Sequence, residues 1–530
     1  MTITAGAERS QGAGAPATAG NSPAPAARHG EGPSSRPGGD PPRPGRPGRR
    51  SPIAAAQAVR LLRKAVAARW ATVPGRLRLA RTGCLLLIAA LLIQLAVSAA
   101  GVRATWNEIA QRDAPRTIAA TQLNLALNDM DAQVANILLS SGDSGTGNGR
   151  LDTPLSHAKT NYGSAQDTIS RSLRTLAAAS EGDKATERTV VTLTDEFAHY
   201  QEIVGRALED DGHPGGKDTA RAQYHWATSV LGEQLLPQAR ALVDANNAVY
   251  ERAYDSAHSD LTTQLSAEAV LGVLLLGALV LIQIRLARDF RRVLNPALLA
   301  ATACALVATL CGGGLLTVNS GELKTARHDS FDSVVALARS QAIGYDANAD
   351  ESRYLLDPSL RGTYEKSFLD KSQQLYGISG ATLDTYDARL ADTWAAYQRN
   401  PADERFTGEY RRELDNLTFP GERAAAERTV EAYAVYEKDD RTMRSLVAQG
   451  KLREATEFCV GWASDTSNAH FGAWMKALDQ VTAINRDHHD RAIAAGRAAV
   501  GTRGVTAAVA LLLAAALLVL GLRPRLAEFR

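Results

Sequence analysis

The nearest approach to a metal-binding cluster in this sequence is the segment RDHHDR, from Arg486 to Arg491. Neighbouring positions on an α-helix point about 100° apart, so His488 and His489 do not easily share one ion. We therefore interpret the segment as a charged, solvated helix face. The sequence has no P-loop, G-x-S-x-G or H-E-x-x-H motif and no cysteine pair at metal-ligand spacing. These observations predict no enzymatic activity and no metal or other cofactor.

The four cysteines likewise give little indication of a chemical site. Cys84, Cys304 and Cys311 fall in long apolar runs, which leaves Cys459 alone in a mixed segment. This distribution does not support a disulfide framework. We interpret Cys459 as a small core residue.

Aromatic side chains are the next candidates, because aromatic and charged groups together can form a ligand pocket. The candidates are Trp226, Trp394, Trp462 and Trp474, together with Tyr224, His225, Arg353 and Tyr354. Aromatic residues at helical spacing are more often part of a packed core. The sequence leaves both interpretations open, and core packing is the more frequent outcome.

A short basic link is the third candidate. Residues 285–295 contain Arg285, Arg288, Arg291 and Arg292 between two long apolar runs. Arginines at such a position first serve to orient the flanking runs in a membrane. They also form charge-assisted hydrogen bonds with carboxylates. We therefore regard Arg288, Arg291 and Arg292 as a candidate contact for an acidic cytoplasmic partner.

The elements that position these residues include four apolar blocks. They cover residues 83–102, 267–284, 296–318 and 504–522. Each block holds roughly 18 to 23 residues with almost no charge, and about 20 residues suffice for a helix to cross about 30 Å of hydrocarbon. The sequence thus predicts an all-α membrane protein with four transmembrane helices.

Basic residues predict the orientation of these helices. They concentrate in residues 53–82, in the link 285–295 and in residues 523–530, and such segments favour the cytoplasmic side. Both termini are then cytoplasmic, and residues 103–266 and 319–503 lie outside the cell membrane. Residues 1–52 are rich in Pro, Gly, Ala and Arg and are predicted to be disordered. The basic segment 53–82 is predicted to be amphipathic and to lie on the inner leaflet.

This topology predicts the outcome of reporter fusions. Reporters that are active only outside the membrane should be active after Ser180 or Gln449 and inactive after Arg292 or Arg530. The measurement is enzymatic activity at matched expression. External activity of a fusion in the link would contradict the four-span topology.

Both external segments are predicted to be four-helix bundles. In the first, Leu123, Leu127, Met130 and Val134 recur at three-to-four spacing, which is typical of a bundle helix. Clusters of Gly, Ser and Pro then separate the helices. We expect further helices at about 154–179, 183–209 and from 219 into the second block, then at about 320–356, 360–399, 421–449 and from 451 into the fourth block.

The two external segments share local sequence. ERTV occurs at residues 187–190 and 427–430, and GKDTARAQYHWA from Gly216 is matched by GKLREATEFCVGWA from Gly450. Val243, Asn246 and Tyr250 similarly correspond to Val481, Asn485 and His489. These matches keep an offset of about 234 to 240 residues and their order, which indicates duplication of a span–bundle–span unit.

A four-helix bundle between two spans, with a Gly-Lys pair opening its last helix and an Asn-centred repeat near the membrane, resembles the sensor domain of methyl-accepting chemotaxis receptors. Those receptors continue into a long signalling coiled coil, whereas only RPRLAEFR follows the fourth block here. The tandem arrangement and four spans are more similar to the GlnX-like family of actinobacterial glutamine-sensing membrane proteins. The resemblance extends from about residue 80 to the end of the chain.

This resemblance implies a non-enzymatic sensor with two partners. Outside, the partner would be an amino-acid-binding lipoprotein; inside, it would be the soluble serine/threonine kinase G. We expect no nucleic-acid partner. An envelope scaffold without signalling and a receptor that binds a small ligand directly stay open as alternatives, as does a homodimer.

Overall fold

Four continuous helices dominate the described part of the chain. The computed structural model describes residues 73–142, 149–180, 182–290 and 295–527. Uninterrupted helices run over Gly75–Ser140, Lys217–Arg288, Pro296–Leu356 and Ser467–Pro524, and we call these four helices the rods. They have 58 to 72 residues, or about 90 to 110 Å at 1.5 Å per residue. Each contains one apolar block and is long enough to cross a membrane, as predicted.

The first half of the structure, residues 73–290, contains eight helical segments. They are α2 (Val73–Glu108), η1 (Ile109–Asp113), α3 (Ala114–Ser140), α4 (Asp152–Ala179), α5 (Lys184–Asp211), α6 (Lys217–Val230), η2 (Leu231–Leu235) and α7 (Leu236–Phe290).

The second half, residues 295–527, is also helical throughout its described elements. It contains α8 (Pro296–Lys324), η3 (Thr325–Phe331), α9 (Asp332–Leu356), η4 (Pro358–Leu360), α10 (Arg361–Leu375), α11 (Tyr386–Arg399), α12 (Glu409–Asp415), α13 (Glu422–Ala448), α14 (Leu452–Val460), α15 (Ser467–Ala499), η5 (Val500–Gly504) and α16 (Val505–Ala527). An isolated β-bridge joins Gly377 and Thr407.

Every rod contains one π-helical segment: η1, η2, η3 or η5. Three of them, η1, η3 and η5, lie close to the end of an apolar block that adjoins an external segment. A π-helical turn is locally wider than an α-helical turn and often marks a functional position in a helix. Three of the four rods thus have a local irregularity near the expected membrane surface.

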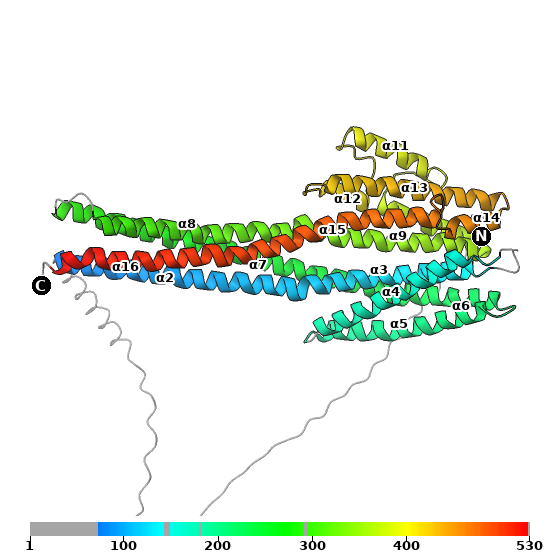
Figure 1. Cartoon of the computed structure of the whole chain (residues 1–530), viewed down its shortest axis with the longest axis horizontal. Helices are drawn as coiled ribbons and strands as arrows, with labels where there is room; N and C mark the ends of the chain where they lie inside the picture. The colour runs from blue at the N-terminus through cyan, green and yellow to red at the C-terminus, as the bar shows by residue number, and fades with distance from the viewer. Residues whose placement is uncertain (1–72, 143–148, 181, 291–294, 528–530) are drawn as a thin grey trace, which may run out of the picture. The chain divides into compact units, whose positions relative to one another are not determined.

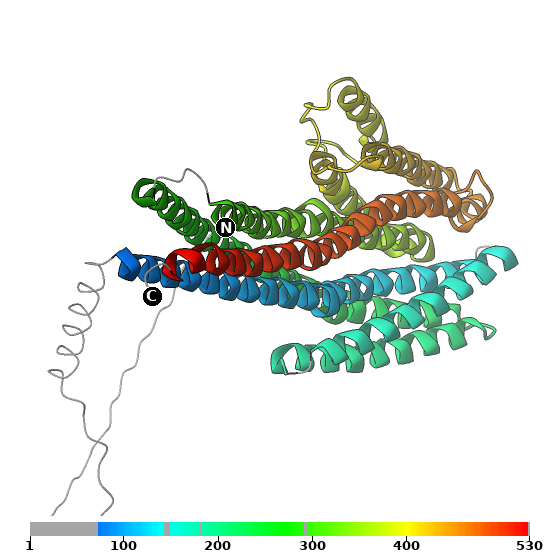
Figure 2. The same ribbon diagram turned by 60° about the vertical axis from the view of Figure 1, so that its left-hand side comes forward.

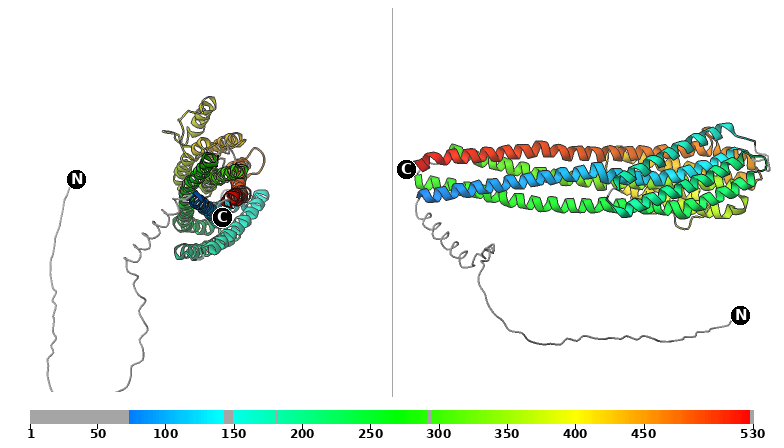
Figure 3. Two further views of the ribbon diagram at one scale, coloured as in Figure 1. Left: turned by 90° about the vertical axis from the view of Figure 1, so that its left-hand side faces the viewer. Right: turned by 90° about the horizontal axis from the view of Figure 1, so that it is seen from below.

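The apolar parts of the rods form a ring of four helices. α7 packs against α2 and α8, and α16 packs against α8 and α2. Their shared core is built from Leu, Ile and Ala side chains, while many other large apolar side chains of these helices point outward. Such outward apolar side chains suit contact with lipid. Figures 1 and 3 show these helices running side by side.

The remaining helices pack on the parts of the rods that lie far from the apolar blocks. In the first half α4 packs on α3 and α5 on α6, whereas in the second half α10 packs on α9 and α13 on α15. α4 and α5 flank the rods on one side, and α11–α13 on another (Figures 1 and 2). α3 also packs along α9. The two halves of the structure are therefore in direct contact through α3 and α9.

The repeated sequences occupy equivalent helices. The two ERTV segments lie in α5 and α13, where Val190 and Val430 are both buried. The two Gly-Lys pairs lie at the starts of α6 and α14. Gly215 and Gly450, which precede these helices, have φ angles of 79° and 76°, a conformation that glycine adopts without strain. This correspondence fits the predicted duplication.

Two predicted helices of the second half are wrong in extent. The helix expected at 360–399 ends at Leu375, and α11 begins only at Tyr386. Between them Gly377 makes two backbone hydrogen bonds of 2.9 Å with Thr407, which replace helical pairing. The helix expected from 451 into the fourth block is also interrupted, because α14 ends at Val460 and α15 begins at Ser467.

Candidate functional site between the two halves

A buried ion pair joins the two halves far from the apolar blocks. Arg353, in the last turn of α9, donates to Asp131 of α3. Their side chains are only 6% and 0% exposed. The Tyr200 hydroxyl at 2.8 Å and the Tyr224 hydroxyl at 3.0 Å also donate to Asp131. The carboxylate thus has the charged and neutral donors that a buried ion requires.

The position of α3 explains why this carboxylate is buried. α4, α7 and α9 all pack on α3, so its polar residues are enclosed together with its apolar stripe. Asn128, Asp131 and Asn136 are all buried. The Ser352 hydroxyl of α9 donates to the Asn136 side chain at 2.7 Å. The polar face of α3 is therefore an internal contact surface for the second half.

Arg353 also belongs to a larger charged cluster. Its guanidinium contacts Asp350 at 2.6 Å and Asp346 at 3.3 Å. Lys371 of α10 contacts both of these aspartates, at 2.9 Å for Asp346. Burial opposes ionisation of Asp346, but Lys371 and Arg353 outweigh it and hold the pKa of that carboxyl below its ordinary value. The cluster sets three carboxylates against two cations, so Arg353 is central to its charge balance.

Other side chains cross between the halves at the same end of the rods. His225 Nε2 lies 3.0 Å from the Asp357 carboxylate. The rings of His157 and Trp462 stack with centroids 4.8 Å apart. These contacts join α4 and α6 of the first half to segments of the second half beside the buried ion pair.

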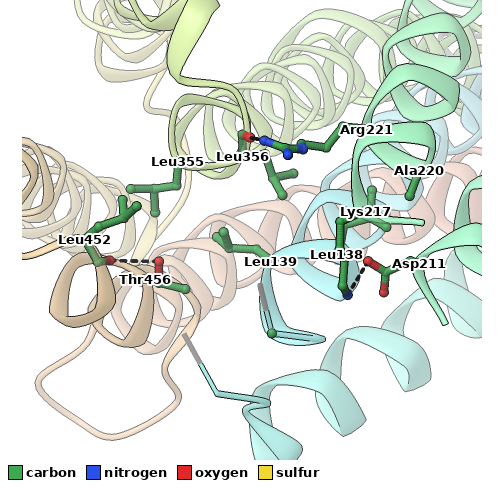
Figure 4. A pocket seen from close by; sticks show the side chains of 11 residues that line it. Leu138, Leu139, Asp211, Lys217, Ala220, Arg221, Leu355, Leu356, Leu452 and Thr456 are labelled. Atoms are coloured by element: carbon green, nitrogen blue, oxygen red, sulfur yellow. Dashed lines mark hydrogen bonds and ion pairs between the residues drawn. The ribbon is translucent and has the colours of Figure 1, made fainter. Parts of the chain in front are cut away.

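A small cavity lies beside these contacts (Figure 4). Its volume is about 40 Å³, and it is lined by Leu138, Leu139, Gly142, Asp211, Lys217, Ala220, Arg221, Leu355, Leu356, Leu452 and Thr456. The Lys217 ammonium donates to Asp211 at 2.6 Å and to the Ser141 hydroxyl at 2.8 Å. The cavity has room for about one water molecule. Lys217 of the Gly-Lys pair thus serves to hold the end of α3 against α6.

A second ionic contact between the halves lies nearer the apolar blocks. Arg327 of η3 is buried and contacts Glu251 of α7 at 2.6 Å. It also donates to the Asn247 side chain at 3.1 Å and lies over the Tyr250 ring at 5.0 Å. A π-helical segment of one half is therefore tied directly to a rod of the other half.

Residues that are equivalent in the repeat meet in this layer. The Tyr250 and His489 rings are 6.5 Å apart and edge-on, and Phe331 contacts both. Burial lowers the pKa of His489, which keeps the ring neutral in the core. His488 instead stacks on Phe419 at 3.8 Å. The adjacent histidines of RDHHDR thus face different surroundings.

The structure separates the aromatic candidates of the sequence. Trp226 is 44% exposed and lies near His199 and Arg206, and Trp462 is 36% exposed. Trp394 and Trp474 are buried in the core of the second half. These four tryptophans do not line one pocket.

The other residues selected from the sequence lie in different parts of the structure. Tyr224 and Arg353 are brought together, with the Arg353 Nε donating to the hydroxyl at 3.3 Å. Cys459 is buried, as predicted. Arg288 is exposed in the last turn of α7, and Arg291 and Arg292 lie outside the described residues.

Sequence reasoning did not identify Asp131, Asp350 or Lys371. A signal was present for Asp131, because Asn124, Asn128 and Asp131 recur at three-to-four spacing beside the apolar stripe. Such a row is compatible with a solvated face as well as with a buried contact. The partner helix that decides between them lies more than two hundred residues further along the chain.

Comparisons with known proteins agree with part of this picture. Residues 105–255 match the family model described as the actinobacterial sensor domain. This region runs from the end of α2 into α7 and includes Asp131, Tyr200 and Tyr224. Searches of curated proteins and of solved structures gave no match. The first half of the chain is thus similar to an actinobacterial sensor domain, which supports a multi-pass sensor membrane protein of actinobacterial type.

Proposed function

We propose that the protein is a non-enzymatic transmembrane sensor in which contact between the two halves sets the arrangement of the four rods. The observation that carries this proposal is the buried Asp131–Arg353 pair at the membrane-distal end of the rods. Packed helices shift between discrete arrangements as rigid bodies. A change at this contact would therefore reach the apolar blocks along continuous helices.

The outer input would be amino-acid availability, presented by a solute-binding lipoprotein. The membrane-distal helices offer surface for such a partner. Trp226 is an exposed aromatic residue next to Arg206, and tryptophan and arginine are enriched among residues that dominate protein interfaces. We propose the surface around Trp226 as the contact for this lipoprotein.

The inner output would be a soluble serine/threonine kinase such as kinase G. The basic link 285–295, which begins in the last turn of α7, would supply the contact, since Arg288 is exposed there. The same link joins α7 to α8, so its geometry responds to both halves. Both termini and this link would lie in the cytoplasm.

A paired pull-down from membranes tests this output. We compare the wild-type chain with a variant in which Arg288, Arg291 and Arg292 are all replaced by Gln. The variant should still insert, because Arg285 and the other basic segments remain, and it should keep the lipoprotein while losing most of the kinase. Three charge-assisted contacts of about 1.5 to 3 kcal/mol each would be removed.

Two outcomes would contradict the proposal. Full retention of the kinase by the triple variant would show that these arginines only orient the helices in the membrane. Residues 53–70 would then be the next candidate for the kinase contact. Retention of both partners at the same level with and without amino acids would instead favour the envelope scaffold. A receptor that binds its ligand directly is the second candidate, and a cavity of about 250 Å³ between α3, α7, α9 and α10 favours it.

A further inference from the structure

The apolar part of α7 begins with a buried carboxyl group. Glu268 is the second residue of the apolar block 267–284, and protein atoms alone reduce its exposure to 4%. Its side chain makes no hydrogen bond or ion pair with any residue that the structure describes. An ionisable side chain between transmembrane helices is costly and often marks a functional position. Packing alone does not account for a carboxyl group here.

Glu268 faces the backbone of α8, which belongs to the other half. A methyl group at Gly312 of α8 would overlap with the Glu268 carboxyl group. One helical turn further along α7, a methyl group at Gly272 would overlap with the Thr309 side chain of α8. Glycine at both positions lets the two helices approach closely, as small residues do in membrane helix pairs. We call the contact of Glu268 and Gly272 with Gly312 and Thr309 the α7–α8 seam.

The two ends of these paired helices are held differently. Near the link, the Gln283 side chain of α7 donates to the Thr302 hydroxyl at 2.6 Å and to the Leu298 carbonyl at 3.2 Å. These hydrogen bonds join neutral groups and do not depend on pH. At the opposite end the polar side chain in the seam is Glu268, which has no such partner. The closure of this end therefore depends on the charge of Glu268.

The surroundings of Glu268 offer no compensation for a negative charge. The titratable or charged side chains of the neighbouring elements near this end of the apolar blocks are Arg103 of α2, Cys311 and Glu322 of α8, and Arg503 of η5. Arg503 donates to the Gly314 carbonyl of α8 at 2.8 Å, and within the described ranges none of these side chains pairs with Glu268. A buried carboxylate without a cation or a hydrogen-bond donor is strongly disfavoured. Glu268 is therefore protonated while the seam is closed.

Water approaches Glu268 from the expected outer side. A cavity of about 140 Å³ lies between α2, α7 and α8, and its lining includes Leu261 and Gln264 of α7. Gln264 lies one helical turn before Glu268. The cavity has room for several water molecules, which would bring the outside solution within one turn of the carboxyl group.

We propose that Glu268 is a proton-binding site that keeps the α7–α8 seam closed when protonated and opens its outer end when the proton leaves. The step is an acid dissociation: the carboxyl O–H bond breaks, its electron pair stays on the carboxylate, and water takes the proton. The ionised side chain would then turn toward the water of the cavity, because hydration supplies the compensation that the seam lacks.

The location of the site gives proton release a mechanical consequence. α7 and α8 belong to different halves and adjoin the basic link on its two sides. A proton that binds the closed seam more tightly than the open one shifts the population toward the closed arrangement. External pH would thus act on the link as an input of its own, which depends on neither the lipoprotein nor the kinase proposed above.

Hydrogen–deuterium exchange of the purified full chain in detergent, read by mass spectrometry, tests the opening. Wild type and Glu268→Gln are compared at the same pH, so that the intrinsic pH dependence of exchange and the ionisation of other carboxyl groups are common to both. At about pH 9 the wild type should exchange about tenfold faster around residues 268 and 312, and at about pH 6 the two should exchange equally. Gly312→Ala should exchange faster than the wild type at both pH values, because the added methyl group displaces Glu268.

Each variant has a matched control. Asp255→Asn removes an exposed carboxylate of α7 outside the seam. Gly321→Ala adds a methyl group to α8 at a position where no other atom lies within 4 Å. Both controls should exchange like the wild type. Equal exchange of the wild type and Glu268→Gln at about pH 9 would overturn the site, and so would faster exchange of the wild type at about pH 6 than at about pH 9 relative to that variant.

Dicyclohexylcarbodiimide, an apolar reagent for protonated carboxyl groups, gives a second measurement on the unchanged chain. Mass spectrometry should find Glu268 modified at about pH 6 and at least about tenfold less modified at about pH 9. Equal modification at both pH values would show that Glu268 does not exchange its proton with the outside solution, and would overturn the proposal. Neither measurement contains a partner protein, so their outcome is independent of the pull-down.

Discussion

Arg353→Met should lower the unfolding temperature of the protein far more than replacement of a half-exposed arginine such as Arg441. The substitution leaves the buried carboxylates of Asp131 and Asp350 and the partly buried carboxylate of Asp346 with Lys371 as their remaining cation in the cluster. Removing one partner of a buried ion pair costs about 3 to 5 kcal/mol, because the other charge stays buried without compensation. The measurement is thermal unfolding of the detergent-solubilised chain at neutral pH.

Two further variants locate the origin of this loss. Asp131→Asn should cost less, because the cluster becomes balanced, with two carboxylates and two cations. The asparagine oxygen replaces only one of the two carboxylate oxygens that accept from Tyr200 and Tyr224, so part of the loss remains. Arg441→Met is the control, since Arg441 forms a half-exposed pair with Asp387 at 2.6 Å and such pairs contribute about 0 to 1 kcal/mol. If Arg353→Met were as mild as Arg441→Met, the buried pair would not hold the halves together.

The sequence was sufficient to predict the elements that depend on local pattern. The four apolar blocks lie in four long helices, because length and lack of charge alone decide whether a helix can span a membrane. The stripe from Leu123 to Val134 is likewise part of a helix, α3. Periodicity predicts such helices because it reflects burial of one face.

Helical periodicity did not predict contacts between segments that are distant in the sequence. Arg353 was recognised as a candidate, but no feature of its neighbourhood in sequence indicates Asp131 as its partner. The bridge between Gly377 and Thr407 is similar, because the residue that ends helical pairing after Leu375 lies thirty positions later. The polar residues Asn124, Asn128 and Asp131 likewise gave no prediction, since helical periodicity does not show whether a polar face contacts water or a second protein surface.

The core of the second half contains an excess of buried carboxyl groups on or beside α13. Glu437 accepts from the Ser372 hydroxyl at 2.7 Å, and Glu351 accepts from the Tyr436 hydroxyl at 2.6 Å. Asp440 pairs with Arg444 at 2.8 Å. Burial raises the pKa of Glu437 from 4.5 to about 8. Burial, together with the nearby Asp440, also raises the pKa of Glu351 well above its ordinary value. Glu437 must therefore release its proton as pH rises through about 8.

We expect the protein to become less stable as pH rises from about 5 to about 8. A carboxyl group whose pKa is higher in the folded than in the unfolded state contributes stability that is complete below its unfolded pKa. For Glu437 that contribution is complete below about 4.5 and is lost as pH rises through about 8. Each pKa unit corresponds to about 1.4 kcal/mol, so the loss should amount to a few kcal/mol. Unfolding temperatures across this range measure the loss.

Glu437→Gln keeps an acceptor for Ser372 but has no titrating proton, so it should flatten the dependence of unfolding temperature on pH. Glu431→Gln, at an exposed position of α13, should leave that dependence unchanged. A wild-type profile that is flat or rises with pH would show that the buried carboxyl groups are already ionised in the folded core.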